Sequence, residues 1–328
     1  MTKRIDPTLV DIAARFSTSS FIVESKAEMP AIREAVTQAR RGLVGRHAAD
    51  VDVADLGDVR RFTPKSDLDR STVIIYVHGG GWVNCDTITH GAIMTDLAYL
   101  TGHEVLGPEY PLAPEAPYPA GLDHVVALVE QTRAARSNVN LVLAGDSAGA
   151  NLSLAVAARL RDMGKGGAVS ALLLWYGCYR ATFETWSHAA FGGGDYGLTT
   201  EAMQRCWEWY LDGQDAAAAP YGDLSGLDVT GLPPAWMCEA ELDCLAADTR
   251  WLAGLYTAAG IDHSYDLFED VNHGFNHFGQ FYSPSLRSIE RAAHFLKRPK
   301  KRYKRGRETT QKRQREPMRL PLVYSVCA

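Results

Sequence analysis

The amino-acid sequence predicts an α/β fold built on a mostly parallel sheet with helices on both faces. Between about residues 50 and 296, short β-branched runs alternate with longer stretches of helical pattern, as in successive strand–helix–strand units. The runs are almost continuously apolar, which is typical of parallel strands buried on both faces. They read TVIIYV (72–77), VNLVLA (139–144), ALLLWY (171–176), AWMCEA (235–240) and SYDLF (264–268).

The size and composition of the chain are those of a globular protein. Its 328 residues suit one large α/β domain with a small appendage, and 46% of them are hydrophobic and 22% charged. The longest nearly apolar run, Ala171 to Tyr179, is far shorter than the roughly 20 residues that a membrane-spanning helix needs. No apolar stretch follows the early basic residues, so we expect no secretory signal, no membrane association and a cytoplasmic location.

The cysteines are scattered without the close pairing that a structural zinc site requires. We therefore expect reduced thiols, and neither a metal nor a cofactor. The six positions are Cys85, Cys178, Cys206, Cys238, Cys244 and Cys327.

Three regions can be separated along the chain. Residues 1–45 have a helical pattern, in which Pro30 marks the expected start of a helix. Residues 46–296 form the expected main α/β domain. Within that domain, residues 181–231 interrupt the strand–helix rhythm and are rich in tryptophan, so we interpret them as a helical insertion over the carboxyl edge of the sheet. The last region, residues 297–328, is polar and basic.

The basic tail carries most of the positive charge of the chain. From Lys297 to Arg319 there are 12 Lys and Arg against two Glu, a net charge of +10; because the whole chain carries −5, the remainder carries −15. We expect a solvated, disordered tail. Binding of a nucleic acid or another anionic partner is the rival interpretation, but a single charge run is weak evidence, and we expect no nucleic-acid partner.

A turn between a strand and a helix carries the strongest chemical signal. Ser147 is the centre of Gly145-Asp146-Ser147-Ala148-Gly149, directly after VNLVLA and before the helical pattern ANLSLAVAARL. A nucleophile on such a sharp turn projects its hydroxyl above the sheet, and small neighbours leave room for the turn. The start of the helix also favours negative charge that develops beside it. We therefore predict that Ser147 is a catalytic nucleophile.

A second motif, His78-Gly79-Gly80-Gly81-Trp82, also follows a strand directly. Consecutive glycines allow backbone N–H groups to turn toward an oxyanion that forms during acyl transfer. A dinucleotide-binding loop would need G-x-G-x-x-G at the start of a helix, which this segment lacks. We expect the ring of His78 to brace the loop and Trp82 to line a substrate pocket.

The general base is expected in a late loop. Hydrolases with a serine on a strand–helix turn order their triad as Ser, acid and His along the chain. His273, in a loop after the last predicted strand, fits this order. His277 is its competitor. His294 lies in the helical pattern SIERAAHFL, where a packing or surface role is expected.

The acid should lie between the serine and the histidine, at the carboxyl end of a strand. Asp243 follows AWMCEA and precedes a helical pattern, DTRWLAGLYTAAG, that leads to the strand before His273. The acid and base loops thus leave adjacent strands. Glu241 is a lesser alternative for the acid, Asp248 is interpreted as a helix N-cap, and Asp146 is expected to point away from the base.

With these residues in place, the chain resembles the hormone-sensitive lipase-like family of bacterial esterases, a branch of the α/β-hydrolases. The resemblance covers about residues 20–296, and five motifs in this order and spacing are highly specific for the family. The motifs are HGGGW (78–82), EYPLAPEAPYPAGLDH (109–124), GDSAG (145–149), ELDCLAAD (241–248) and HGF (273–275).

This resemblance implies the α/β-hydrolase fold, with an eight-stranded sheet and a helical cap formed by residues 1–45 and 181–231. Two positions depart from the family pattern: Pro111 stands where an arginine is usual, and residues 243–245 read D-C-L instead of D-P-L. Both departures concern loop rigidity and pocket shape. The implied triad is Ser147, Asp243 and His273, and the implied oxyanion hole consists of the amides of Gly80, Gly81 and Ala148.

The activity that the resemblance implies is hydrolysis of short- to medium-chain acyl esters through an acyl-enzyme. An amidase or deacetylase with the same triad is the closest alternative. A non-catalytic small-molecule-binding protein on this fold is another, but such relatives typically lose the serine or the histidine, and this chain has both. Deletion of residues 297–328 separates an esterase, which keeps its turnover, from a binder that depends on the tail. A homodimer is among the oligomeric states that the sequence permits.

Overall fold

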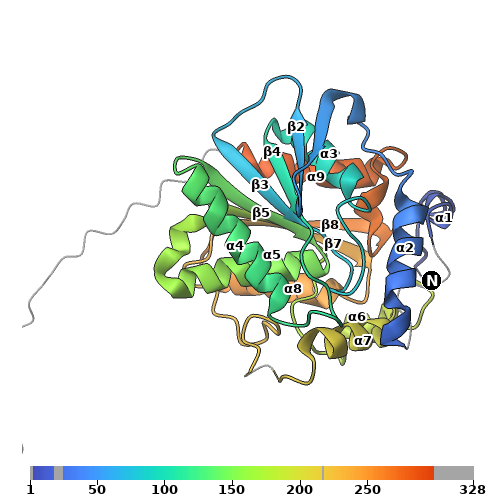
Figure 1. Ribbon diagram of the computed structural model, residues 1–328. Coiled ribbons are helices and arrows are strands. Elements are labelled where there is room, and N and C mark those ends of the chain that lie inside the picture. The colour runs from blue at the N-terminus through green and yellow to red at the C-terminus, as the bar shows by residue number, and fades with distance from the viewer. Residues whose placement is uncertain (1–2, 18–24, 216–217, 299–328) are drawn as a thin grey trace, which may run out of the picture. The chain divides into compact units, whose positions relative to one another are not determined.

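The computed structural model describes residues 3–17, 25–215 and 218–298 (Figure 1). Within these residues, eight strands form one sheet in the order β1-β2-β4-β3-β5-β6-β7-β8. The sheet is parallel from β4 to β8 along this order, while β2 is antiparallel to both of its neighbours. The strands are β1 (Val51–Asp55), β2 (Val59–Pro64), β3 (Thr72–Val77), β4 (Glu104–Pro108), β5 (Asn140–Asp146), β6 (Ala171–Trp175), β7 (Ala235–Leu242) and β8 (His263–Asn272).

The predicted α/β fold with a mostly parallel, eight-stranded sheet is confirmed. The five apolar runs are β3, β5, β6, β7 and β8. The sequence analysis did not identify β1, β2 and β4. Most side chains of β1 and β2 are exposed or half-buried, because these strands form an antiparallel pair at the edge, so they lack the continuous apolar pattern. Strand β4 has five residues, two of them Gly107 and Pro108, which weaken its strand signal.

Helices cover both faces of the sheet (Figure 1), and a hydrophobic core lies on each face. Val73, Ile75 and Val77 of β3 join the core beneath α4, α5 and α8, whereas Ile74 and Tyr76 join the core beneath α3 and α9. This division follows from the alternation of side chains along a strand. The helices are α1 (Pro7–Ala14), α2 (Met29–Arg40), α3 (Gly91–Thr101), α4 (Ala120–Ala135), α5 (Ala148–Leu160), α6 (Trp186–Phe191), α7 (Thr200–Leu211), α8 (Ala246–Ala258) and α9 (Ser283–Leu296).

Two helix starts test the local predictions. Pro30 lies in the first turn of α2, as expected for a residue that lacks an amide donor. The prediction that Asp248 is an N-cap is wrong, because α8 begins two residues earlier, at Ala246. The buried carboxylate of Asp248 instead accepts hydrogen bonds from the amides of Tyr179 and Arg180 and forms an ion pair with the Arg180 guanidinium at 2.7 Å.

The expected insertion between β6 and β7 contains α6 and α7. Each helix has a threonine N-cap: Thr185 accepts from the amide of His188, and Thr199 accepts from the amide of Ala202. Figure 1 shows both helices near α2, beyond one end of the strands. Helices α6 and α7 thus occupy the expected insertion, and its role as a cap stays a prediction.

Further properties of the chain follow from the described residues alone. None of their helices is long and apolar enough to cross a membrane. The cysteines at positions 85, 178, 206, 238 and 244 are buried and unpaired, and Cys327 lies outside the described residues. Helix α9 ends at Leu296, and one compact unit extends to Lys297. The predicted disordered tail, residues 297–328, falls outside the described residues from position 299 onward.

Candidate active site

Ser147 occupies the sharp turn between β5 and α5. Its backbone angles are φ 53° and ψ −121°, a conformation that non-glycine residues rarely adopt. The turn is crowded: a Cβ added to Gly149 would lie 2.0 Å from the carbonyl oxygen of Val77. The small neighbours predicted for this turn are therefore required, and the surrounding packing holds Ser147 in a strained conformation.

The side chains of Ser147, His273 and Asp243 form a continuous hydrogen-bonded chain. The Oγ of Ser147 lies 2.9 Å from Nε2 of His273, and Nδ1 of His273 lies 2.6 Å from Oδ2 of Asp243. Ser147 and Asp243 are buried, and His273 is half-buried. The second carboxylate oxygen of Asp243 accepts the amide of Leu245 at 2.9 Å, which fixes its orientation. The structure therefore brings together the three predicted residues in the predicted order.

Strand register explains this convergence. Leu242 of β7 pairs with Asn272 of β8, so Asp243 and His273 leave the sheet side by side. A register shift between Ala240 and Leu242 marks an irregularity just before the acid, and such bulges re-aim the side chains that follow. Ser147 follows β5, which is parallel to β7 and separated from it by β6; Asp146 of β5 pairs with Trp175 of β6. Parallel strands end at one edge, which places all three loops together.

An aromatic ring supports the imidazole of His273. The ring of Tyr176 packs edge-on against it, with centroids 4.8 Å apart and planes inclined by 60°. The Tyr176 hydroxyl donates to the side-chain oxygen of Asn276. Burial raises the pKa of Tyr176 well above its ordinary value, so this phenol stays protonated and acts as a donor.

The competing acids and bases lie elsewhere. Glu241 pairs with Lys3 and accepts the amide of Asp270 at 3.1 Å, so its carboxylate is engaged at the rim of the sheet. His277 is buried against His90, with ring centroids 4.5 Å apart, and burial holds its pKa well below the ordinary value. Among the described residues, neither Glu241 nor His277 forms a hydrogen bond with a side chain of the triad. His294 is exposed on α9.

The glycine loop after β3 has a backbone conformation that favours glycine. Gly80 and Gly81 have φ values of +120° and +59°. A Cβ on Gly80 would lie 2.0 Å from the carbonyl oxygen of Asn84, so only glycine fits there. Within the described part of the chain, the amides of Gly80 and Gly81 donate to no acceptor, and the amide of Ala148 opens α5, where an intrahelical acceptor is missing. These three amides remain the candidate oxyanion donors.

Asp146 and His78 brace the two loops. The carboxylate of Asp146 turns away from His273 and accepts the Tyr76 hydroxyl at 2.8 Å and the amide of Gly79 at 3.0 Å. Burial opposes its ionisation, but His90 and these hydrogen bonds hold the pKa of Asp146 well below its usual range. The ring of His78 stacks on Tyr110 with centroids 4.3 Å apart, which fits the expected bracing role.

A cavity of about 300 Å³ opens beside Ser147. Its walls combine residues from the glycine loop, the nucleophile turn and the loop after β8 with residues from the N-terminal region and the insertion. Trp82 differs from the expectation: its indole is buried away from these walls, stacked on Tyr210 with centroids 4.2 Å apart. Residues that line the cavity from the two candidate cap regions include Ala13, Ser17, Arg40, Leu198, Ala202 and Met203.

The sequence analysis missed the polar wall of this cavity. Arg40, Cys85, His90 and His277 all line it. Arg40 is the last residue of α2, a helix that the sequence pattern predicts. The pattern does not indicate which residue of this helix lines the cavity. Only the tertiary placement of α2 identifies it.

Three buried side chains near the nucleophile have potential ligand atoms within 4.8 Å of one another: His90, Asp146 and His277. Imidazole and carboxylate donors suit divalent transition metals. However, Oδ1 of Asp146 accepts the Tyr76 hydroxyl, and the Arg40 guanidinium lies 3.5 Å from Nε2 of His277. A cation would compete with the first contact and be repelled by the second. We therefore interpret the cluster as a hydrogen-bonded support of the nucleophile turn.

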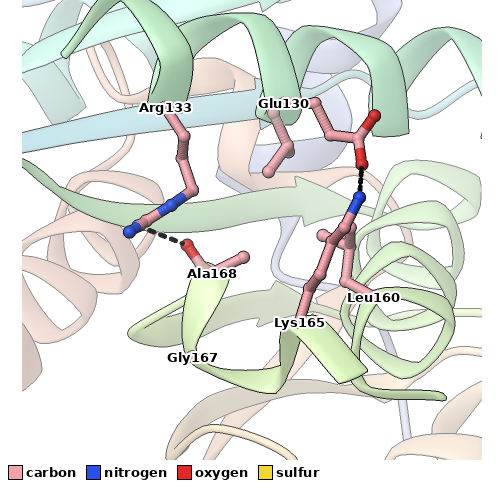
Figure 2. A pocket seen from close by; sticks show the side chains of 7 residues that line it. Glu130, Arg133, Leu160, Lys165, Gly167 and Ala168 are labelled. Carbon is pink, nitrogen blue, oxygen red and sulfur yellow. Dashed lines mark hydrogen bonds and ion pairs between the residues drawn. The ribbon is translucent and has the colours of Figure 1, made fainter. Parts of the chain in front are cut away.

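A second cavity, of about 540 Å³, lies between α4 and the segment after α5 (Figure 2). Its charged groups are already engaged: Lys165 pairs with Glu130, and Arg133 donates to the carbonyl oxygen of Ala168 at 3.2 Å. Apolar side chains of Val129 and Leu160 complete the lining. This arrangement stabilises the packing of two helices and offers no nucleophile or free acid–base pair.

Comparisons with known proteins identify related proteins of the same fold. A family model described as alpha/beta hydrolase fold matches residues 74–277. The acetyl esterase of Salmonella schwarzengrund is 34% identical over 249 residues, which span 73% of this chain and 76% of that protein. A hyperthermophilic esterase from the archaeon Pyrobaculum calidifontis has a TM-score of 0.78 and 26% identity, covering 90% of this chain and 98% of that one. An esterase from the bacterial hormone-sensitive lipase family shares the fold, with a TM-score of 0.79 and 24% identity over 89% of this chain and 97% of that one.

Proposed function

The chain belongs to the α/β-hydrolase fold family, and from this premise we propose that it is a serine carboxylesterase of the hormone-sensitive lipase-like branch. The observation that carries the proposal is the pair of hydrogen bonds that joins Ser147 to His273 at 2.9 Å and His273 to Asp243 at 2.6 Å. The name of the curated relatives, acetyl esterase, supports carboxylic esters as the substrate class.

The first half-reaction acylates the enzyme. The Oγ of Ser147 attacks the ester carbonyl carbon, and Nε2 of His273 accepts its proton. Asp243 holds the imidazole in the tautomer that receives this proton and stabilises the imidazolium. The carbonyl electron pair moves onto oxygen, where the amides of Gly80 and Gly81, together with that of Ala148, stabilise the oxyanion. When the intermediate collapses, the alcohol leaves with the proton from His273.

The second half-reaction releases the acid. Water attacks the acyl-enzyme while His273 accepts one of its protons, and the same amides stabilise the second oxyanion. The bond between the acyl carbon and Oγ then breaks, and the proton returns to Ser147. The chain's own groups supply every proton transfer in this scheme.

Cavity size and lining support small acyl groups. The cavity of about 300 Å³ is at the lower end of the roughly 300–1,000 Å³ that ligand pockets span. We assign residues 1–45 and 181–231 to a cap over the catalytic domain, residues 46–296, because both segments contribute to the wall that faces Ser147. A cytoplasmic location is part of the proposal, supported by the buried, unpaired thiols of the described chain.

The decisive experiment combines a substrate series with a matched pair of variants. p-Nitrophenyl esters of increasing acyl length are assayed with the wild type, Ser147→Ala and Ser71→Ala, the last at an exposed serine. We expect short-chain esters to be hydrolysed fastest, Ser147→Ala to lose at least about 10⁴-fold in kcat, and Ser71→Ala to match the wild type. Undiminished turnover by Ser147→Ala would refute the proposal.

The same protein samples distinguish an esterase from an amidase. p-Nitrophenyl acetate and p-nitroacetanilide carry the same acyl group on oxygen and on nitrogen. An esterase hydrolyses the first far faster than the second. Comparable kcat/KM values for the two substrates would favour the amidase assignment of the same triad.

A further inference from the structure

An arginine faces the catalytic cavity without a carboxylate partner. Arg40 is the last residue of α2, is half-buried, and lines the cavity that also contains Ser147 and His273. Among the described residues its guanidinium forms no ion pair; its polar contacts are the Sγ of Cys85 at 3.9 Å and Nε2 of His277 at 3.5 Å. In this respect Arg40 differs from Arg33, about two turns earlier on the same helix, which pairs with Glu115.

Both neighbours of Arg40 are uncharged at neutral pH. Burial raises the pKa of the Cys85 thiol to about 11, despite the opposing effect of Arg40, so Cys85 is not a thiolate. Burial, with the positive charge of Arg40, holds the pKa of His277 well below its ordinary value, so His277 is a neutral imidazole. The positive charge of the guanidinium is therefore not balanced by either contact.

The carboxylates of Asp86, the residue after Cys85, and of Asp146, in the cavity wall, already accept hydrogen bonds. Asp86 accepts the Thr37 hydroxyl at 2.5 Å and the amide of Thr89 at 2.7 Å. Asp146 lies 3.3 Å from Nε2 of His90 and accepts two further hydrogen bonds from its own surroundings. Neither carboxylate forms an ion pair with Arg40, although Asp146 lines the same cavity.

His277 adds a second donor without an acceptor. Because arginine only donates hydrogen bonds, its contact makes Nε2 of His277 the acceptor, and the neutral ring must carry its proton on Nδ1. Nδ1 is buried and has no partner among the described residues, although the ring is 95% buried and lines the cavity. A buried donor without an acceptor, beside a guanidinium without a counter-charge, leaves polar interactions unused, which is costly unless a ligand supplies them.

We propose that Arg40 is a specificity-determining residue that binds a carboxylate of the substrate, so that the preferred substrates are esters that carry a second, ionised carboxyl group. This inference rests on the proposed esterase function and names the substrate class for the same cavity. A guanidinium matches a carboxylate with two parallel hydrogen bonds, and such charge-assisted pairs are the strong ones.

The position of Arg40 relative to the reacting atoms supports this role. Cys85, its contact, lies against the oxyanion loop: a Cβ on Gly80 would approach the Cβ of Cys85 to 3.0 Å. Arg40 is thus one side chain removed from the loop that would hold the ester carbonyl. A carboxylate can reach it from the acyl side or from the alcohol side of the substrate, and the two sources are distinguished by experiment.

The test compares each anionic ester with its neutral primary amide. Monoethyl adipate carries the carboxylate on the acyl side, and the acetate ester of 4-hydroxybutanoate carries it on the alcohol side. The amides keep the size and polarity of the carboxylates but remove the charge. For at least one pair we expect the wild type to prefer the anionic ester by about tenfold or more in kcat/KM, mainly through KM.

Three variants assign the preference to Arg40. Arg40→Met keeps much of the length of the side chain and should reduce the ratio of anionic to neutral kcat/KM by about tenfold or more. Arg40→Lys keeps the charge without the planar fork and should retain part of the ratio. Arg41→Met, at the exposed next residue, should leave the ratio unchanged. The Ser147→Ala protein allows the same esters to be compared by calorimetric binding, without turnover.

The outcomes separate the two proposals. Equal hydrolysis of the anionic and neutral members of both pairs by the wild type would overturn the role of Arg40 and leave the esterase assignment intact. A strong preference that Arg40→Met does not change would also overturn it. Failure of the wild type to hydrolyse any ester would refute the proposed function and this inference together. If Arg40→Met does not fold, the partial loss in Arg40→Lys decides.

Discussion

At the scale of single residues, the carboxylate of Asp146 connects the two loops that the proposed reaction needs. It belongs to the nucleophile turn, yet it accepts the amide of Gly79 from the glycine loop and the hydroxyl of Tyr76 from β3. The neighbour of the nucleophile therefore positions the oxyanion loop while Ser147 itself faces His273. Asp146 is therefore a positioning residue, and the sequence motif around Ser147 does not indicate this role.

Removal of the acid's charge tests the orientation of the base. In Asp243→Asn, Nδ1 of His273 faces an amide, which favours the wrong imidazole tautomer, so we expect kcat to fall by about 10⁴-fold. Glu241→Gln serves as the matched control, because Glu241 pairs with Lys3 and should affect kcat little. Steady-state kinetics with a short-chain ester provides the measurement. A larger loss in Glu241→Gln than in Asp243→Asn would reassign the acid.

The glycine loop provides a second test at this scale. A Cβ at Gly80 meets the carbonyl oxygen of Asn84 at 2.0 Å, so the loop of Gly80→Ala must shift. Displacement of one oxyanion donor predicts a loss of about 10²–10³-fold in kcat. Gly57→Ala is the control: Gly57 also has a positive φ, +77°, but a Cβ there meets no atom within 4 Å. It should cost about 1–2 kcal/mol of stability in urea unfolding, with normal turnover. Equal turnover of the two variants would contradict the role of the loop.

At the scale of elements, Arg33 fastens α2 to the segments around the cavity. Its Nε donates to the carbonyl oxygen of Val83 at 2.8 Å, and Nη2 donates to that of Ala113 at 2.8 Å. Its guanidinium also pairs with Glu115 at 2.6 Å. One side chain thus ties a helix of the N-terminal region to the loop that continues from the oxyanion glycines.

Substitution of Arg33 should therefore weaken the attachment of α2 to the segments around the cavity. In Arg33→Met, two buried carbonyl oxygens lose a charged donor, and we expect a loss of about 1.5–3 kcal/mol in the free energy of unfolding. KM should rise, because α2 carries Arg40, which lines the cavity. Urea unfolding and limited proteolysis, with the exposed Arg41→Met as control, provide the measurements. Unchanged protease resistance and KM would show that α2 is held by other contacts.

At the scale of the whole molecule, buried histidines couple folding to pH. Burial, followed by the charges of Arg40 and His90, holds the pKa of His277 well below its ordinary value. The unfolded chain binds a proton there below about pH 6.5, while the native state does not, so stability must fall as the pH decreases below that value. His78 acts in the same direction, because burial also lowers its pKa. The lowered pKa of Asp146 affects the stability of the fold only in more acidic solution.

A comparison of unfolding free energies tests this coupling. For the wild type we expect lower stability near pH 5 than near pH 7.5, with up to about 1.4 kcal/mol per pH unit from each of His78 and His277. His277→Gln should reduce that difference, whatever its effect on the absolute stability. His294→Gln, at an exposed histidine of α9, should leave the difference unchanged. The same pH dependence in wild type and His277→Gln would show that His277 does not contribute.

The local sequence pattern predicts the helices and strands whose apolar residues have a strong periodicity. Strands β3, β5, β6, β7 and β8 and the helices after them follow from apolar runs and turn signals, and Ser147, His273 and Asp243 were identified from their places after strands. The edge strands β1 and β2 could not be predicted in this way, because their half-exposed side chains lack a continuous apolar pattern. The start of α8 was misjudged because the carboxylate of Asp248 bonds to a distant segment, at Arg180, instead of capping its own helix.

The sequence by itself thus determined the fold class, five of the eight strands and the residues of the candidate triad, because strand periodicity and tight turns are local properties. Tertiary structure alone decided which side chains face the cavity. In the folded chain the ring of Trp82 is buried against Tyr210. Arg40, on a separate helix, contacts Cys85. The physical reason is that the packing of a cap depends on contacts between segments far apart in the chain, and the local pattern of neither segment records them.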